Sequence, residues 1–169
     1  LKALATKKHT KDFLDHAGGD QWFILDGTSA NGPKTKVKKE LLEGNGFTVM
    51  MVYVDARSDV AQERNVARGK DPNKHSWHPN AVTTSWNNLN LPTSEKGPRA
   101  RQAALEAGIN EDESLKQYYA RLFGNNFVVA DNNPASEEPA LPQDSSKCPI
   151  PEPLNWNEIR SKIESFLRS

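Results

Sequence analysis

The amino-acid sequence predicts an α/β fold with a parallel β-sheet. One observation behind this prediction is the order of elements, because short apolar runs typical of buried strands alternate with amphipathic helical segments. Another is that each apolar run stops at an aspartate, namely Asp26, Asp55 or Asp131. The carboxyl ends of parallel strands meet at one edge of a sheet, where ligands bind, so we expect the three carboxylates to line that edge.

Three strands are predicted, at residues 22–26, 47–54 and 126–130. The run FTVMMVYV at 47–54 is rich in β-branched and aromatic residues and is uninterrupted, which is typical of a strand buried on both faces. Helices are predicted from apolar residues at helical spacing and from Pro and Gly at their ends, with Ser58 or Asp59 as the N-cap after the second strand. The predicted helices cover residues 2–17, 33–43, 58–67, 82–89, 98–107, 111–123 and most of 154–169.

The chain is expected to fold as one α/β core over residues 1–133. Within it, residues of about 69–97 are rich in Lys, Pro, Asn and His and are predicted to form a lid. Six prolines mark residues 134–153 as an extended linker. The helix within 154–169 has one apolar face, which we expect to dock on the same domain. That face consists of Trp156, Ile159, Ile163, Phe166 and Leu167.

The composition excludes several classes of protein. Lys and Arg total 22 and so do Asp and Glu, so no net charge attracts the chain to nucleic acid or to a membrane, and we expect neither DNA nor a membrane as partner. The lone Cys148 excludes an internal disulfide and a cysteine-based metal cluster, and it fits a reducing, cytoplasmic setting.

The first candidate site is the tripeptide Asp26-Gly27-Thr28 at the end of the first predicted strand. A carboxylate there can hold Mg²⁺ through water or accept a proton from a hydroxyl nucleophile, and Thr28 can donate a hydrogen bond to a phosphate. Asp-Gly is also an ordinary turn sequence at the end of a strand. The tripeptide alone leaves both interpretations open.

The second candidate site is the pair Arg64 and Arg68, which lie four residues apart and therefore on the same side of their helix. Two guanidinium groups so placed can grip phosphate oxygens bidentately. The alternative is a solvated helix face on which Asp59 or Glu63 pairs with the arginines. Lys70 extends the positive charge into the predicted lid, as closure over phosphates would require.

The sequence His75-Ser76-Trp77-His78 invites a comparison with metal sites. No matching set of ligands occurs elsewhere in the chain, so a zinc site is not predicted. Trp77 and Trp86 are interpreted as packing residues or as a stacking surface beside a nucleobase.

The joint pattern of these motifs resembles P-loop kinases of the zeta-toxin and adenylate-kinase-like kind, and most closely phage-type members. The stretch that carries the resemblance is ILDGTSANGPKTKVKKELLEGNGFTVMMVYVDARSDVAQERNVARG, followed by Ser85-Trp86-Asn87, by Leu122-Phe123-Gly124 and by NFVVADNN, and it spans about residues 20–133. The resemblance implies a three-layer P-loop NTPase-like fold that uses ATP and Mg²⁺. It implies phosphoryl transfer to a nucleotide, a polynucleotide end or a sugar nucleotide.

By the same resemblance, Asp26 corresponds to the acidic residue near Mg²⁺ and substrate. Arg64 and Arg68 correspond to lid arginines that touch the phosphates of ATP, with Thr28 and Lys70 as further cofactor contacts. The role of Asp55 is less defined, because it marks only the end of the next strand.

One defining element of these kinases, a glycine-rich loop ending in Gly-Lys-Ser/Thr, does not occur in the 169 residues. The nearest string, Gly32-Pro33-Lys34-Thr35, lacks the upstream glycine and strand, so we do not expect it to cradle phosphates. The sheet is therefore expected to be incomplete or rearranged at its N-terminal part. We expect a missing N-terminal segment or a second chain to complete it. The start at Leu1 instead of Met favours the missing segment.

Two hypotheses follow. In the first, the chain is the C-terminal part of a P-loop kinase-like phosphotransferase, which transfers phosphate poorly without the missing loop. In the second, it is a non-catalytic α/β binding or structural module that kept the scaffold and lost the nucleotide site.

Overall fold

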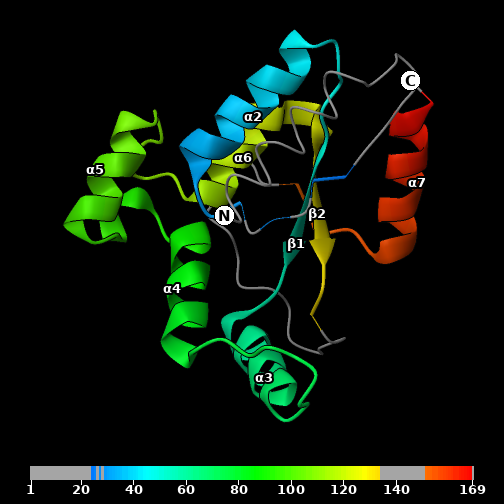
Figure 1. Ribbon diagram of the computed structural model, residues 1–169. Helices are drawn as coiled ribbons and strands as arrows, with labels where there is room; N and C mark the ends of the chain where they lie inside the picture. Colours follow the sequence, from blue (N-terminus) through cyan, green and yellow to red (C-terminus); the bar gives the residue numbers. More distant parts are fainter. Residues whose placement is uncertain (1–23, 26, 28, 134–150, 169) are drawn as a thin grey trace.

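The computed structural model describes residues 24, 25, 27, 29–133 and 151–168. Over these residues the chain is a mixed α/β fold with six α-helices and a two-stranded parallel sheet, which confirms the predicted fold class (Figure 1). The elements in chain order are α2 (Gly32–Gly44), β1 (Met51–Asp55), α3 (Ser58–Gly69), α4 (Pro79–Asn90), the 3₁₀ turn η1 (Thr93–Glu95), α5 (Pro98–Glu106), α6 (Leu115–Phe123), the 3₁₀ turn η2 (Gly124–Asn126), β2 (Phe127–Asp131) and α7 (Trp156–Leu167).

The sheet pairs β1 with β2 in parallel, and the register sets Met51 opposite Phe127 and Asp55 opposite Asp131. Both arrows point the same way in Figure 1, so the two strands end side by side. Leu154 forms a further parallel bridge to Ala130, with its N–H donating to Val129 O and its carbonyl accepting from Asp131 N. Two of the three predicted carboxylates therefore lie together at the carboxyl edge.

Side chains alternate along each strand, so the sheet has two faces, and helices cover both of them. On one face Tyr53 and Val129 belong to a core with residues of α6, of which Tyr119 is fully buried. On the other face Val128 and Ala130 pack against α7 through Ile159, which is 2% exposed. In Figure 1 α7 lies on one side of the strands and α6 on the other. The prediction that the C-terminal helix docks on its own domain is confirmed.

Helix α2 packs closely on α6 through Gly32. The helix starts where it does because Asn31 Oδ1 accepts from Lys34 N and Pro33 occupies the first turn. A Cβ at Gly32 would lie 2.9 Å from Leu115 Cδ1, so only glycine allows this approach. The expectation that Gly32-Pro33-Lys34-Thr35 is no phosphate cradle is consistent with this packing, since side chains of α6 cover Gly32.

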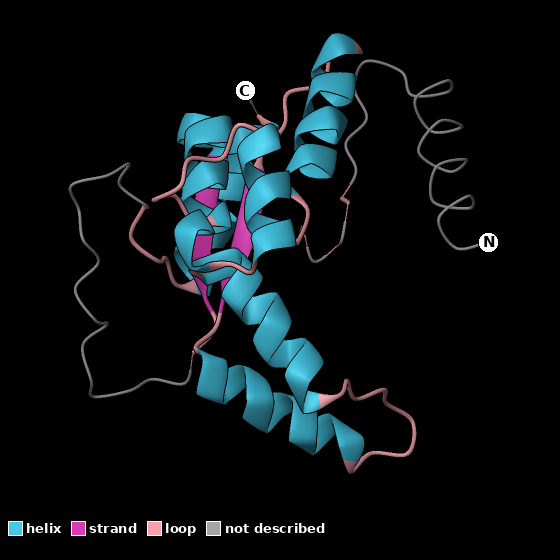
Figure 2. Ribbon diagram, turned by 90° about the vertical axis from the view of Figure 1, so that its left-hand side faces the viewer, coloured by secondary structure: helices cyan, strands magenta, loops and turns pink. Residues whose placement is uncertain are grey.

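Helices α3 and α4 form a hairpin beyond the ends of the strands, seen at the bottom of Figure 1 and at the lower right of Figure 2 with its connecting loop in pink. Gln62 Nε2 donates to Pro79 O at 2.9 Å and to Thr83 Oγ1 at 2.8 Å across the two helices. Trp86 Nε1 donates to Ala56 O at 2.9 Å and thereby ties α4 to the end of β1. The predicted helix at 82–89 is confirmed and extended to Pro79–Asn90.

Three details differ from the predictions. Ile24 and Leu25 are not in a strand and are 81% and 46% exposed, because the chain that follows is held at α6, where the Tyr119 hydroxyl donates to Ser29 O. The strand predicted from residue 47 begins at Met51. The N-cap of α3 is Arg57, since the carboxylate of Asp59 accepts both of its bonds from the Arg57 guanidinium.

The start of α6 also shifts from the predicted residue 111 to Leu115, because Ser114 and Gln117 form a capping box there. Several predictions lie outside the described residues. They concern the helix at 2–17, residues 22, 23 and 26 of the first strand, the side chains of Asp26 and Thr28, and residues 134–150 of the linker.

Replacing Gly32 by Ala should destabilise the protein by about 1–3 kcal/mol, because the new methyl group overlaps Leu115 and Ile109. The matched control is Gly44→Ala at the other end of the same helix, where a Cβ meets nothing within 4 Å. That variant should gain about 0.5–1 kcal/mol from the lower entropy of the unfolded chain. Urea unfolding of both variants tests the difference, and equal stability of the two would contradict the close packing of α2 on α6.

The three tyrosines of the chain should ionise late, because burial raises the pKa of each one, and the pKa of Tyr119 to about 12. A tyrosine whose pKa is raised in the folded state contributes fully to stability below its unfolded pKa of 10. This contribution is lost as the pH rises from 10 through the folded pKa. We therefore expect the free energy of unfolding to fall between pH 10 and about 12. Near-ultraviolet absorbance of tyrosinate measures this, and a native titration that coincides with that of the urea-unfolded chain would contradict it.

Candidate functional site

The candidate site is the carboxyl edge of the sheet, where backbone hydrogen bonds tie the two strand ends together. Asn132 N donates to Asp55 O at 3.0 Å, directly after β2. Asn133 Oδ1 accepts from Arg57 N at 2.7 Å, and Asp131 Oδ1 accepts from Asn133 N at 2.9 Å. The chain leaving β1 and the chain leaving β2 are therefore held in one fixed arrangement, from which α3 starts at Ser58.

The strongest electrostatic feature of this edge is the ion pair between Lys116 on α6 and Asp55 on β1. Lys116 Nζ lies 2.7 Å from Asp55 Oδ2, and the two side chains are 5% and 21% exposed. The same ammonium lies 5.4 Å from the centroid of the Tyr53 ring, a cation–π contact. Burial first, and then the charge of Asp55, raise the pKa of Tyr53 well above its usual value, so its hydroxyl stays protonated.

Lys116 was not predicted as a site residue. One signal in the sequence indicates it, because Lys116, Tyr119, Ala120 and Phe123 follow the i, i+3, i+4, i+7 spacing of a buried helix face. A lone cation in such a stripe needs a buried anion as partner. The identity of that partner is not visible in the sequence, since Asp55 lies 61 residues away.

Arg64 and Arg68 are exposed and, among the described residues, have no hydrogen bond or ion pair. The alternative in which Asp59 pairs with them is wrong, because Asp59 is bound by Arg57 at 2.9 Å. The Arg57 guanidinium lowers the pKa of Asp59 through this contact. Two free guanidinium groups thus lie one turn apart on the helix that leaves the carboxyl edge.

The remaining predicted site residues are only partly brought together. Lys70 is exposed at the end of α3, whereas Lys74 forms a 3.2 Å ion pair with Asp71. Asp26 and Thr28 lie outside the described residues, so their predicted contacts with Mg²⁺ and phosphate stay predictions. Within the described ranges no three His, Cys, Asp or Glu side chains come close enough together to hold a metal ion.

The two tryptophans of the hairpin have different environments. Trp86 is half-buried and its indole donates to Ala56 O, so it is a packing residue. Trp77 is 68% exposed, and the packing interpretation is wrong for it. The stacking interpretation of Trp77 stays a prediction.

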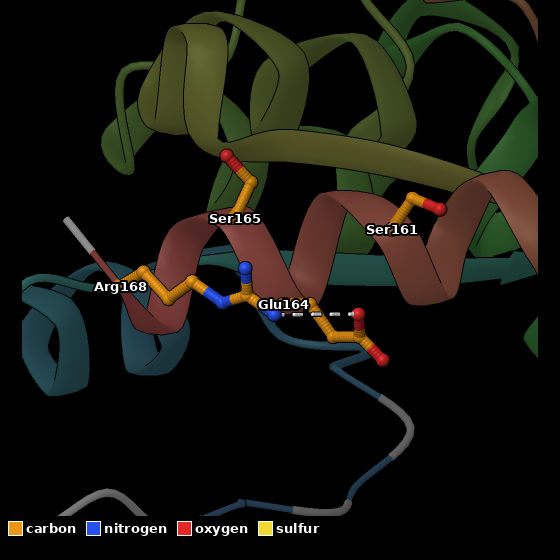
Figure 3. A pocket seen from close by; sticks show the side chains of 4 residues that line it. All are labelled: Ser161, Glu164, Ser165 and Arg168. Carbon is orange, nitrogen blue, oxygen red and sulfur yellow. Dashed lines mark ion pairs between the residues drawn. The ribbon is translucent and has the colours of Figure 1, made fainter.

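A hollow of about 400 Å³ lies elsewhere, on α7, and is lined by Ser161, Glu164, Ser165 and Arg168 (Figure 3). Glu164 and Arg168 approach each other across it at 3.9 Å, while the two serines point to the other side of the helix in this view. Helix α7 begins at Trp156, just after Leu154 bridges to Ala130 near the carboxyl edge, and it runs back along the strands, so this hollow lies at the opposite end of the sheet (Figure 1). It is not part of the candidate site.

Comparison with known proteins adds no assignment. No protein-family model matches the chain, and neither a curated protein nor a solved structure matches it significantly. No helix in the described part of the chain has the length and apolarity needed to cross a membrane.

Replacing Lys116 by Met should destabilise the protein by about 3 kcal/mol, because it leaves Asp55 without its buried counter-charge. The control is Lys36→Met, which breaks the exposed Lys36–Glu40 pair of α2 and should cost less than about 1 kcal/mol. Urea unfolding measures both. A similar small loss in the two variants would mean that the Lys116–Asp55 pair does not hold α6 to the sheet.

Proposed function

We propose that the chain is the C-terminal part of an ATP-dependent, P-loop kinase-like phosphotransferase. The observation that carries this proposal is the pair Arg64 and Arg68, which are exposed and without ion-pair partners in the described part. Their helix starts three residues after β1 ends at the carboxyl edge of a parallel sheet, which is where α/β proteins bind ligands. Arg64 and Arg68 lie six and ten residues along that helix from Ser58, and their two guanidinium groups suit the oxygens of a phosphoryl group.

The finer fold of the proposal is a three-layer P-loop-like sheet that is incomplete in this chain. It is supported by the helices on both faces and by the edge of β1 away from β2, which has no strand partner among the described residues. A further strand and the glycine-rich loop would come from an N-terminal segment outside these 169 residues or from a second chain. Without that loop, transfer of phosphate from ATP by this chain should be weak.

In this proposal ATP and Mg²⁺ supply the phosphoryl group and the charge that balances it. Arg64 and Arg68 hold phosphate oxygens, and Lys70 and Thr28 are additional contacts. Asp26 holds Mg²⁺ through water or orients the acceptor hydroxyl. The residues of the described part that fit a phosphate are the two arginines, and the ion pair of Asp55 with Lys116 assigns Asp55 to the scaffold.

A second candidate function is a non-catalytic α/β binding module. The observation that favours it is the same ion pair, because the strand-end carboxylate of β1 is already neutralised by Lys116 at 2.7 Å. A carboxylate paired in this way is a weaker ligand for a metal ion and a weaker base for an acceptor hydroxyl. The two functions differ in what they require of Arg64 and Arg68, because only the phosphotransferase needs them to hold the phosphates of ATP.

Calorimetric titration with Mg²⁺-ATP tests the proposal. We expect binding by the unmodified protein, weakened about tenfold or more in Arg64→Ala and in Arg68→Ala, because each loses charged hydrogen bonds to phosphate. Arg99→Ala is the control, since Arg99 is an exposed arginine of α5 without an ion pair in the described residues. Absence of binding, or equal affinity in all four proteins, would favour the binding module.

A further inference from the structure

Trp77 is held in an unusual way for an exposed side chain. The backbone N–H of Trp77 donates to Asn65 Oδ1, and the backbone carbonyl of Trp77 accepts from Asn65 Nδ2, both at 2.7 Å. Asn65 is 8% exposed, whereas Trp77 is 68% exposed. An exposed indole offers a flat apolar surface on which another ring can stack, and here the backbone that carries it is fixed by a buried amide. The loop presents the indole at a defined place on the hairpin.

The residue that holds the Trp77 backbone is a neighbour of the two arginines along α3. Arg64 directly precedes Asn65 in α3, and Arg68 follows it by three residues, which is about one helical turn. The loop continues along the same helix, because a Cβ at Gly69 would lie 3.1 Å from Ser76 Oγ. The backbone of Trp77 is therefore bonded to a residue of α3 that lies within one helical turn of both Arg64 and Arg68.

The charge of the hairpin favours an anionic partner. Asp59 and Asp71 are engaged by Arg57 and Lys74, and α4 carries no charged residue at all. The side chains without an ion pair in this part of the chain are one acid and three cations. These are Glu63, Arg64, Arg68 and Lys70, and at helical spacing Glu63 points away from the side shared by the two arginines.

The surface is open. Every residue from 72 to 81 is exposed, so nothing in the loop encloses a ligand. A mononucleotide site buries most of its ligand in a concave pocket. An open surface with a cation pair and an exposed aromatic ring suits a single strand, whose phosphates and bases make several separate contacts.

We propose that the α3–α4 hairpin binds single-stranded nucleic acid, with a base stacked on Trp77 and backbone phosphates held by Arg64 and Arg68. The net charge of zero describes the whole chain and did not predict such a partner, whereas residues 58–90 of the hairpin carry four Lys and Arg against three Asp and Glu. This inference goes beyond the proposed function and does not rest on it, because Arg64 and Arg68 would hold phosphates of the strand in place of the phosphates of ATP.

The test is fluorescence anisotropy of an end-labelled oligothymidylate of about ten nucleotides, without ATP or Mg²⁺. Trp77→Ala should weaken binding about tenfold or more, and Trp77→Phe should keep most of it, because a smaller ring still stacks. The control is Trp156→Ala, which removes a tryptophan that is 55% exposed on α7. It should leave binding unchanged, and circular dichroism verifies that all variants fold.

The salt dependence separates the phosphate contacts from stacking. Each lost contact to a single strand should make the slope of log affinity against log salt shallower by about 0.7, so Arg64→Ala combined with Arg68→Ala should lower it by about 1.4. Trp77→Ala should leave the slope nearly unchanged. A duplex of the same length should bind more weakly, because its bases are not free to stack.

The proposal is overturned if the oligonucleotide does not bind, if Trp77→Ala binds as tightly as the unmodified protein, or if the duplex binds equally well. Oligonucleotide binding that depends on Trp77, without any binding of Mg²⁺-ATP, would keep this inference and remove the phosphotransferase. Binding of Mg²⁺-ATP without any Trp77-dependent binding of the oligonucleotide would remove this inference and keep the proposed function.

Discussion

The contact on which the described structure most depends is the ion pair between Lys116 and Asp55, because it fixes α6 to the end of β1. A lysine that is 5% exposed would be strongly destabilising without an anion, so α6 has one favourable position relative to the strand. The Tyr53 ring lies against the same ammonium and joins the core that α6 forms with β2. The carboxyl edge of the sheet is thus set by electrostatics and the core below it by apolar packing.

A two-stranded sheet has little stability alone, and here the helices supply what the strands lack. Core residues of α6 cover one face and Ile159 of α7 covers the other, while Leu154 bonds to the backbone of β2. Within the described residues, no strand pairs with the far edge of β1. Unpaired strand edges attract further strands. The unpaired edge of β1 therefore supports the proposal that another segment completes the sheet.

The sequence predicted the elements whose cause is local. Pro33 and Gly44 bound α2, and the β-branched run before Asp55 forms β1. It did not predict what depends on distant neighbours. The apolar character of Ile24 and Leu25 indicated a buried strand, yet burial needs an adjacent strand to pair with, and the chain is held at α6 instead. At the site, the spacing of Arg64 and Arg68 predicted that they share one side of their helix. The partner of Lys116 and the hydrogen bonds of Asn65 to the Trp77 backbone could not be predicted, because no local pattern reveals them.

The two hydrogen bonds between the Asn65 side chain and the Trp77 backbone connect the loop of the hairpin to α3. Because Asn65 is part of α3, the position of Trp77 is tied to the helix that carries Arg64 and Arg68. Because Trp86 donates to Ala56 O and Arg57 N donates to Asn133 Oδ1, the hairpin is also tied to the ends of both strands. A strand of nucleic acid held at Trp77 and at the arginines would therefore keep a constant orientation to the carboxyl edge.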